Sequence, residues 1–200
     1  MAEPGESVVP VLEVVSGSDE EVEEALRGEQ ELPEAMPVLP LRDTVAYPDT
    51  LAPLGVGQEG SIKLVDDVLA GNRMLVMVAS RDPEEDMPSP DQLHGVGVVG
   101  VVTRMLKVPD GTIRVLVQGS QRVRLGDFVT EKPYLVARIT EMPDVIEETP
   151  ELEALTRNVQ KTFSDIIEQI PYLPEELQLA VTNVDDPSAL SHLIAGALRI

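Results

Sequence analysis

The sequence predicts an α+β fold, in which a small β barrel with one inserted helix is followed by a bundle of amphipathic helices. Three observations lead to this prediction. Short apolar runs separated by turn residues fill residues 36–145, apolar residues at helical spacing fill residues 146–200, and residues 1–35 have a strongly acidic composition of their own. We therefore divide the chain into an acidic leader 1–35, a β domain 36–145 and a helical region 146–200.

The composition narrows the possible functions. Hydrophobic residues make up 42% of the chain, which is enough for a core, but aromatic residues make up only 2%. The formal net charge of -21 repels phosphate. This charge and the scarcity of aromatic residues both argue against a nucleic-acid partner. Cysteine is absent, which excludes disulfides and thiolate metal sites. Without a signal sequence or a membrane-length apolar run, we expect a cytoplasmic protein with no membrane contact.

The leader is predicted to be a disordered tail. It holds eleven acidic residues against one basic residue, Arg27. Ser18 and Glu21 form a capping-box pattern, but a helix from there to Arg27 is too short to be more than marginal in water.

The β domain opens at Met36 to Gly57, where two apolar runs flank a polar turn and predict strand, turn, strand. A helix capped by Ser61 and ending at Gly71 is predicted next. The apolar run 74–79 predicts a central strand that is buried on both faces, and the proline-rich, acidic residues 81–92 predict an exposed loop.

Further strands are predicted at 96–108, 112–117, 122–129 and 134–142, and Pro109-Asp110-Gly111 predicts a hairpin turn between the first two. About six strands around one helix predict a small closed or half-closed barrel. The basic residues of these hairpins alternate at strand spacing, which favours a solvated sheet face over a binding stripe for acidic ligands. They are Arg104, Lys107, Arg114, Arg122 and Arg124.

Three amphipathic helices are predicted in the helical region. Thr149-Pro150-Glu151 begins a long helix that ends before Pro171 and Pro174, a second helix runs from Pro174 to about residue 184, and Asp186-Pro187 caps the third. The predicted apolar stripe of the first helix is Leu152, Leu155, Val159, Phe163, Ile166 and Ile170. We expect one apolar face of this bundle to stay open.

One motif suggests an enzyme. Residues 55–60 match the dinucleotide pattern G-x-G-x-x-G through Gly55, Gly57 and Gly60, and they precede a helix. A small nucleotide-binding enzyme is therefore a remote alternative, although Pro53 and the surrounding hairpins favour a plain turn. His94 and His192 are predicted to be exposed and unconnected. We expect no catalytic site, no cofactor and no metal in these residues.

Several motifs, in this order, resemble the amino-terminal domain of the Lon family of ATP-dependent proteases. They are MPVLPLRDTVAYPD at 36–49, SIKLVDDVLAGN at 61–72, RDPEEDMPSPDQLHGVGVV at 81–99, KVPDGTIRVLVQGSQRVRL at 107–125 and VDDPSALSHLIAGAL at 184–198. The resemblance implies a PUA-like β domain followed by a helical bundle that the family continues toward its ATPase, so that the bundle is truncated here. In the family, this region gathers substrates and helps a hexameric ring to assemble.

The resemblance favours a non-catalytic substrate-recognition and assembly domain of an ATP-dependent Lon-type serine protease. Its partners would be unfolded or damaged proteins and other Lon subunits. The alternative is a stand-alone adaptor with the same domain. We predict substrate contacts at the exposed parts of the opening motif, Leu41, Arg42 and Tyr47, and at a turn from Gly119 to Arg122.

Overall fold

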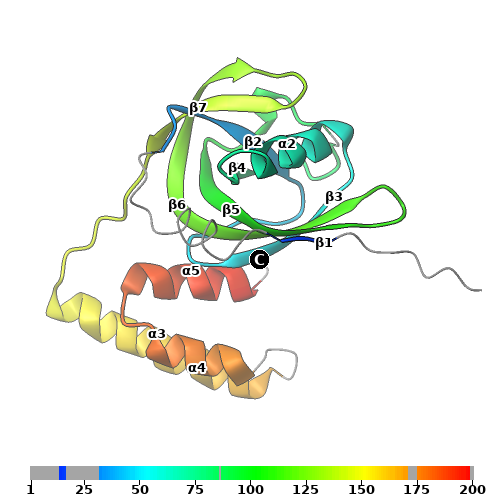
Figure 1. Ribbon diagram of the computed structural model, residues 1–200. Helices are drawn as coiled ribbons and strands as arrows, with labels where there is room; N and C mark the ends of the chain where they lie inside the picture. The colour runs from blue at the N-terminus through cyan, green and yellow to red at the C-terminus, as the bar shows by residue number, and fades with distance from the viewer. Residues whose placement is uncertain (1–13, 17–31, 86, 171–174, 199–200) are drawn as a thin grey trace, which may run out of the picture.

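The computed structural model describes residues 14–16, 32–85, 87–170 and 175–198. It consists of a β barrel, a helix against the barrel wall and a layer of three further helices, which an extended linker joins to the barrel (Figure 1). The strands are β1 (Val14–Ser16), β2 (Ala35–Leu41), β3 (Leu51–Val56), β4 (Met74–Ala79), β5 (Val96–Lys107), β6 (Ile113–Thr130) and β7 (Leu135–Glu141). The helices are α2 (Glu59–Leu69), α3 (Pro150–Gln169), α4 (Glu175–Asn183) and α5 (Pro187–Leu198). The predicted α+β class is confirmed.

Five strands close the barrel. Their pairings run from β5 through β4, β2, β7 and β6 and return to β5. β2 and β4 are parallel, because β3 and α2 form a crossover between them, and the other neighbours are antiparallel. β3 pairs with the first part of β6 and β1 pairs with the last part of β5, so each lies outside the closed ring. Register shifts between β5 and β6 and between β6 and β7 make the barrel irregular.

Two apolar clusters stabilise the β domain. One fills the barrel interior and the other lies between the barrel wall, β3 and α2. β4 contributes to both, because Val76 and Val78 lie in the interior cluster while Leu75 and Met77 lie in the outer one. The prediction of a strand buried on both faces is therefore confirmed.

Two boundary predictions in the β domain are wrong. The predicted turn at Gly119 to Arg122 is absent, because residues 113–130 form the single long strand β6, which β5 accompanies from Ile113 to Arg124. Helix α2 begins before Ser61, with Gln58 at the N-cap, and its C-cap is Ala70. Leu64, Val65 and Val68 are buried against the barrel, and no side chain caps the N-terminus of this helix.

The helical layer has its own core of Phe163, Ile167, Val181 and Leu190. The predicted caps are confirmed: the Thr149 hydroxyl accepts the Leu152 N–H at 3.1 Å, and Asp186 Oδ1 accepts the Ala189 N–H at 2.7 Å.

The predicted stripe of α3 is only partly correct. Leu155 is 58% exposed and Val159 is exposed, while Ile167, which was not in the predicted stripe, is buried. The reason is length, because α4 has 9 residues against the 20 of α3. The Gln160 amide, which donates to the carbonyls of Val181 and Val184, marks where α4 ends along α3.

The leader differs from the predicted disordered tail at Val14–Ser16, which form β1. The predicted helix from Ser18 to Arg27 lies outside the described residues. Residues 81–92 are exposed over most of their described length, and they include a short 3-10 helix at Pro90–Gln92.

Candidate functional site

A groove of about 1850 Å³ lies between the barrel and the helical layer. The β2–β3 loop, β3 and the start of α2 line its barrel side. Its helical side is lined by Leu177 of α4 and by Leu193, Ala195, Gly196 and Ala197 of α5. Three large apolar residues that line the groove are exposed: Val45 (52%), Leu51 (51%) and Met87 (73%). Exposed apolar side chains gathered along one groove are typical of a surface that binds another molecule.

The β2–β3 loop is fastened to the middle of β6. The Asp49 N–H donates to the Gly119 carbonyl at 3.2 Å, and the Gly119 N–H donates to the Thr50 carbonyl at 2.9 Å. Asp49 has a φ of 58°, which turns the chain back into β3. A Cβ atom on Gly119 would collide with the Tyr47 carbonyl oxygen. Glycine is therefore needed at position 119 so that the loop can lie directly on the strand.

Tyr47 connects this loop to α5. Its ring centroid lies 6.4 Å from that of His192, with 31° between the ring planes. A Cβ atom built on Gly196 would lie 3.8 Å from Tyr47 Cδ2, so the backbone of α5 also approaches the ring. His192 is half-buried here, and its Nδ1 atom is buried without a hydrogen bond, so the prediction that His192 is exposed is wrong. His94 is exposed, as predicted.

A polar cluster fastens the barrel to the linker and to α5. Arg122 of β6 forms an ion pair with Asp144, which lies in the linker between β7 and α3. Partial burial acts to raise the pKa of Asp144, but hydrogen bonds from Ser188 and Arg122 outweigh it and hold that pKa below its usual value. Asp144 is therefore ionised at neutral pH and holds three segments together.

β3 supplies an open strand edge beside the groove. Among the described strands it pairs only with β6. The Thr50 carbonyl accepts a hydrogen bond from the Gly119 N–H of β6. In an antiparallel pair every second residue bonds to the partner strand, so Ala52 and Leu54 direct their backbone groups to β6. Leu51, Pro53 and Gly55 direct their backbone groups outward. Pro53 has no N–H, which suits it to this edge and removes one donor from it.

The geometry contradicts the dinucleotide hypothesis. A parallel β-α-β unit needs the strands on either side of the helix to share a sheet in parallel. Here β3 is antiparallel to β6, while β4 lies between β2 and β5. Gly60 has a different reason to be glycine, because a Cβ atom there would lie 2.7 Å from the Pro133 carbonyl oxygen. Gly55 and Gly57 have no such close contact.

The predicted substrate-contact residues occupy different environments. Leu41 is only 5% exposed and belongs to the outer core cluster, so the expectation that it is exposed is wrong. Arg42 is exposed and lines the groove, and Tyr47 is half-buried at its end next to α5. Gly119 lies beneath Tyr47, and Arg122 pairs with Asp144, so neither lines the groove.

Sequence reasoning missed most of the groove. Leu51 and Met87 gave no signal, because a single apolar residue in a strand or loop does not show whether it is exposed. Leu193 of α5 also lines the groove, and apolar spacing along a helix does not show which residues face a neighbouring domain. Asp144 and Ser188 are 44 residues apart in the sequence, and no local pattern predicts that they meet.

The described part of the chain has neither a metal-binding cluster nor a membrane-spanning helix. It contains no group of three or more His, Cys, Asp or Glu side chains arranged to hold a metal ion. Its helices include none that is long and apolar enough to cross a membrane.

The barrel, the helical layer and the apolar groove between them define a module with a surface suited to binding. Residues 35–200 match the family model described as the ATP-dependent protease La (LON) substrate-binding domain, and the chain belongs to this family. It is 42% identical over 173 residues to a Lon protease of Dictyoglomus thermophilum and 40% identical over 192 residues to one of Trichlorobacter lovleyi. These matches cover 86% and 93% of this chain but only 22% and 24% of the two relatives. The chain therefore spans about a quarter or less of their length.

Two solved structures share the fold. The N-terminal domain of a Mycobacterium avium complex Lon protease matches with a TM-score of 0.67 and 23% identity, over 82% of each chain. A Lon N-terminal domain protein from Xanthomonas campestris matches with a TM-score of 0.51 and 19% identity, over 80% of this chain and 97% of that one.

Proposed function

We propose that this chain is the substrate-recognition and assembly domain of an ATP-dependent Lon-type serine protease, and that it captures unfolded or damaged proteins without itself catalysing their cleavage. The observation that carries the proposal is the groove with Val45, Leu51 and Met87 exposed along it. Folded proteins bury their apolar segments, so a groove of this kind binds chains that have lost their structure.

The capture surface combines three features. The groove receives apolar side chains, the outer edge of β3 offers backbone groups to an extended chain, and Arg42 and Tyr47 contact the bound segment at the loop. Leu41 supports this loop from the core and does not touch the substrate. Pro53 interrupts the strand edge, which keeps the pairing weak and reversible.

Weak capture becomes effective when several copies act together. Other subunits of the same protease are the proposed assembly partners, as a hexamer in the cytoplasm. A ring of such domains raises the effective concentration of binding sites for one long unfolded chain, so that modest individual affinities suffice. ATP hydrolysis and peptide cleavage are assigned to other parts of a longer protein. The curated relatives are about four times as long as this chain.

The test uses the full chain and a model protein kept unfolded by reduction and carbamidomethylation. Leu51→Glu places a charge in the groove, and Val129→Glu is the matched control, because Val129 is 59% exposed at the far end of β6 and does not line the groove. We expect L51E to weaken binding about tenfold in fluorescence anisotropy, since about 1.4 kcal/mol corresponds to that factor. V129E should bind like the wild type. Equal binding by both variants would exclude the groove as the capture surface.

A further inference from the structure

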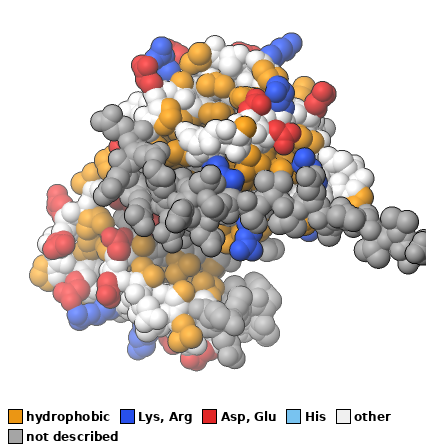
Figure 2. All heavy atoms as spheres, in the orientation of Figure 1, with side chains coloured by type: hydrophobic (Ala, Val, Ile, Leu, Met, Phe, Trp, Pro, Cys, Tyr) orange, Lys and Arg blue, Asp and Glu red, His pale blue; other side chains and the backbone are white. Residues whose placement is uncertain are grey.

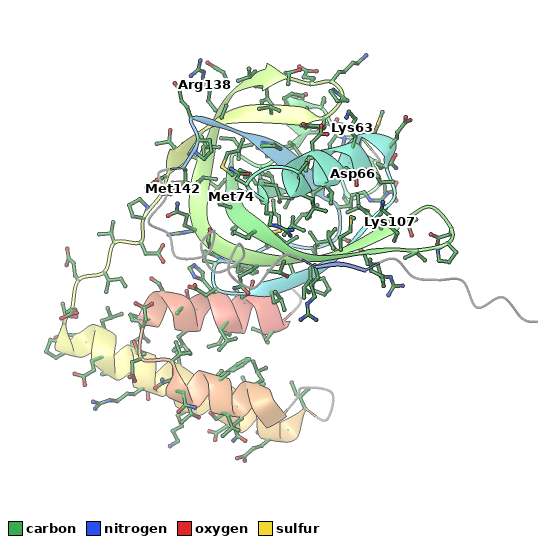
Figure 3. The ribbon with its side chains drawn as sticks, in the orientation of Figure 1. Lys63, Asp66, Met74, Lys107, Arg138 and Met142 are labelled. Atoms are coloured by element: carbon green, nitrogen blue, oxygen red, sulfur yellow. The ribbon has the colours of Figure 1, made fainter. Side chains whose placement is uncertain are left out.

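The last part of β5 projects beyond its neighbour β4. The pairing of β4 with β5 ends where Met74 meets Val101, and the Val102 N–H then donates to the Arg73 carbonyl at 2.9 Å. On its other side, β5 stays paired with β6 as far as Lys107. Residues 103–107 therefore have one backbone edge that the barrel does not cover, on the hairpin arm where Figure 3 labels Lys107.

β1 lies against this uncovered edge. Its three residues pair antiparallel with β5, with Val14 opposite Leu106, Val15 opposite Met105 and Ser16 opposite Arg104. In the part of the chain that the structure describes, β1 pairs with no other strand. A three-residue strand contributes few hydrogen bonds, and each has a small net free energy. The pairing is therefore weak enough to exchange with another extended segment.

β1 is joined to the barrel through a long connecting segment, so it can bind to the edge of β5 as an intramolecular ligand. The match to the family model begins at residue 35, so β1 lies outside the part of the chain that the family model shares. Residues 17–34 connect it to β2, and a segment of that length spans up to about 60 Å when extended. β1 can leave the edge and return to it without disturbing the barrel.

Basic side chains close to β1 favour the closed arrangement locally. The leader carries eleven acidic residues and only one basic residue. Arg104 lies opposite Ser16, and Arg114 lies opposite Leu106 on the other side of β5, and both arginines are exposed. These cations attract the acidic leader at low salt, and salt screens the attraction.

We propose that residues 103–107 of β5 form a second binding edge for extended polypeptide, and that β1 of the leader is an intramolecular competitor for it. The inference rests on the proposed function for its physiological ligand. The unfolded substrate displaces β1 and adds a strand to the arm, so that the leader reduces the affinity of the free domain and substrate segments must outcompete it.

A reversible lock tests this competition. The chain has no cysteine, and paired residues of antiparallel strands lie at a distance that a disulfide can bridge. In the variant S16C/R104C, oxidation should hold β1 on the edge and reduction should release it. We expect the oxidised form to bind the unfolded model protein about tenfold more weakly than the reduced form, because the disulfide blocks the second edge and leaves only the groove to bind. Equal affinity of the two forms would overturn the proposal.

Two controls separate the possible outcomes. R104S, treated with the same oxidant and reductant, should show no redox dependence, so that the loss of the Arg104 charge is accounted for. A second measurement needs no substrate. The single variant R104C, kept reduced, is incubated with a synthetic peptide of residues 8–20 that carries Cys in place of Ser16, activated as its 2-thiopyridyl disulfide. The introduced thiolate of the protein attacks the peptide sulfur and releases pyridine-2-thione, whose absorbance reports the rate.

The peptide should form a mixed disulfide faster than a peptide that also carries Pro in place of Val14 and Val15, because proline cannot pair with the edge. Equal rates would refute β1 as a displaceable strand. If neither redox form of S16C/R104C bound the unfolded model protein, the proposed function would be refuted. The reaction rates of the two peptides would then decide whether β1 is a displaceable strand.

Discussion

Replacing Gly119 by alanine should loosen the wall of the groove. A Cβ atom at this position collides with the Tyr47 carbonyl oxygen, which is a backbone atom and cannot rotate away. Gly119 does not have a positive φ, so the cost comes from this contact and not from backbone strain. Inserting a methyl group into a closely packed site costs about 1–3 kcal/mol. Moving the loop to relieve the contact would instead weaken its two backbone hydrogen bonds to Gly119, which cost about 0.5–1.5 kcal/mol each.

Gly126→Ala is the matched control on the same strand. The nearest neighbour of a Cβ atom at Gly126 is the Arg138 carbonyl oxygen, at 3.5 Å, which is an ordinary contact. Because alanine loses less backbone entropy than glycine on folding, G126A should be neutral or stabilising by up to about 1 kcal/mol.

Urea unfolding of the two variants, followed by circular dichroism, measures both changes. We expect G119A to lower the free energy of unfolding by about 1–3 kcal/mol relative to the wild type. It should also weaken binding of the unfolded model protein, because Tyr47 moves away from His192. If G119A were as stable as G126A, the close approach of the loop to β6 would be refuted.

The remaining predictions concern the junction with the helices and the cap of α3. Asp144→Asn removes the anion that Arg122 and Ser188 share. It should destabilise the docking of the helical layer by about 0.5–1.5 kcal/mol, because solvent screens this partly exposed pair, and the change should be seen as faster hydrogen exchange in α5. The exposed Asp127→Asn should change nothing. Because folding lowers the pKa of Asp144, its contribution is present above the unfolded-state pKa of about 3.9 and is lost as pH falls through the folded-state pKa. The difference in stability between the wild type and D144N should therefore shrink below about pH 4, and a difference that stayed constant in acid would exclude this linkage. Thr149→Ala removes the cap of α3 and should cost about 0.5–2 kcal/mol in thermal unfolding; no change would show that the cap is dispensable.

Local sequence patterns predicted a strand or helix well where the residues of the segment itself specify its structure. The run 74–79 reads as a doubly buried strand in the sequence, and β4 has apolar neighbours on both faces. The caps at Thr149 and Asp186 also follow from short-range hydrogen bonds that a sequence motif specifies. The prediction of a turn from Gly119 to Arg122 failed, because these residues continue the strand β6. At position 119, glycine serves a backbone contact with a loop some seventy residues earlier in the chain.

The sequence predicts the overall charge of the chain, but it does not predict which charged residues meet in the folded structure. The sequence reveals an acidic leader and a net charge of -21. In Figure 2, acidic side chains predominate among the charged groups of the helical layer on the face shown. The sequence did not reveal that Arg104 lies opposite Ser16 of the leader, because that pairing depends on how far β5 extends beyond β4.

By itself, the sequence determined the fold class, the order of the helices and of most strands, most of the caps, and the family through its series of motifs. These properties depend on the periodicity of apolar residues and on hydrogen bonds between close neighbours in the chain. The sequence did not reveal β1 or the continuity of β6. Tertiary structure alone decided that Leu41 is buried while Leu51 is exposed, that β3 leaves an edge open beside a groove, and that Asp144 joins Arg122 to Ser188. A groove forms only when segments distant in the chain pack against each other, and no periodicity encodes which surfaces that packing leaves uncovered.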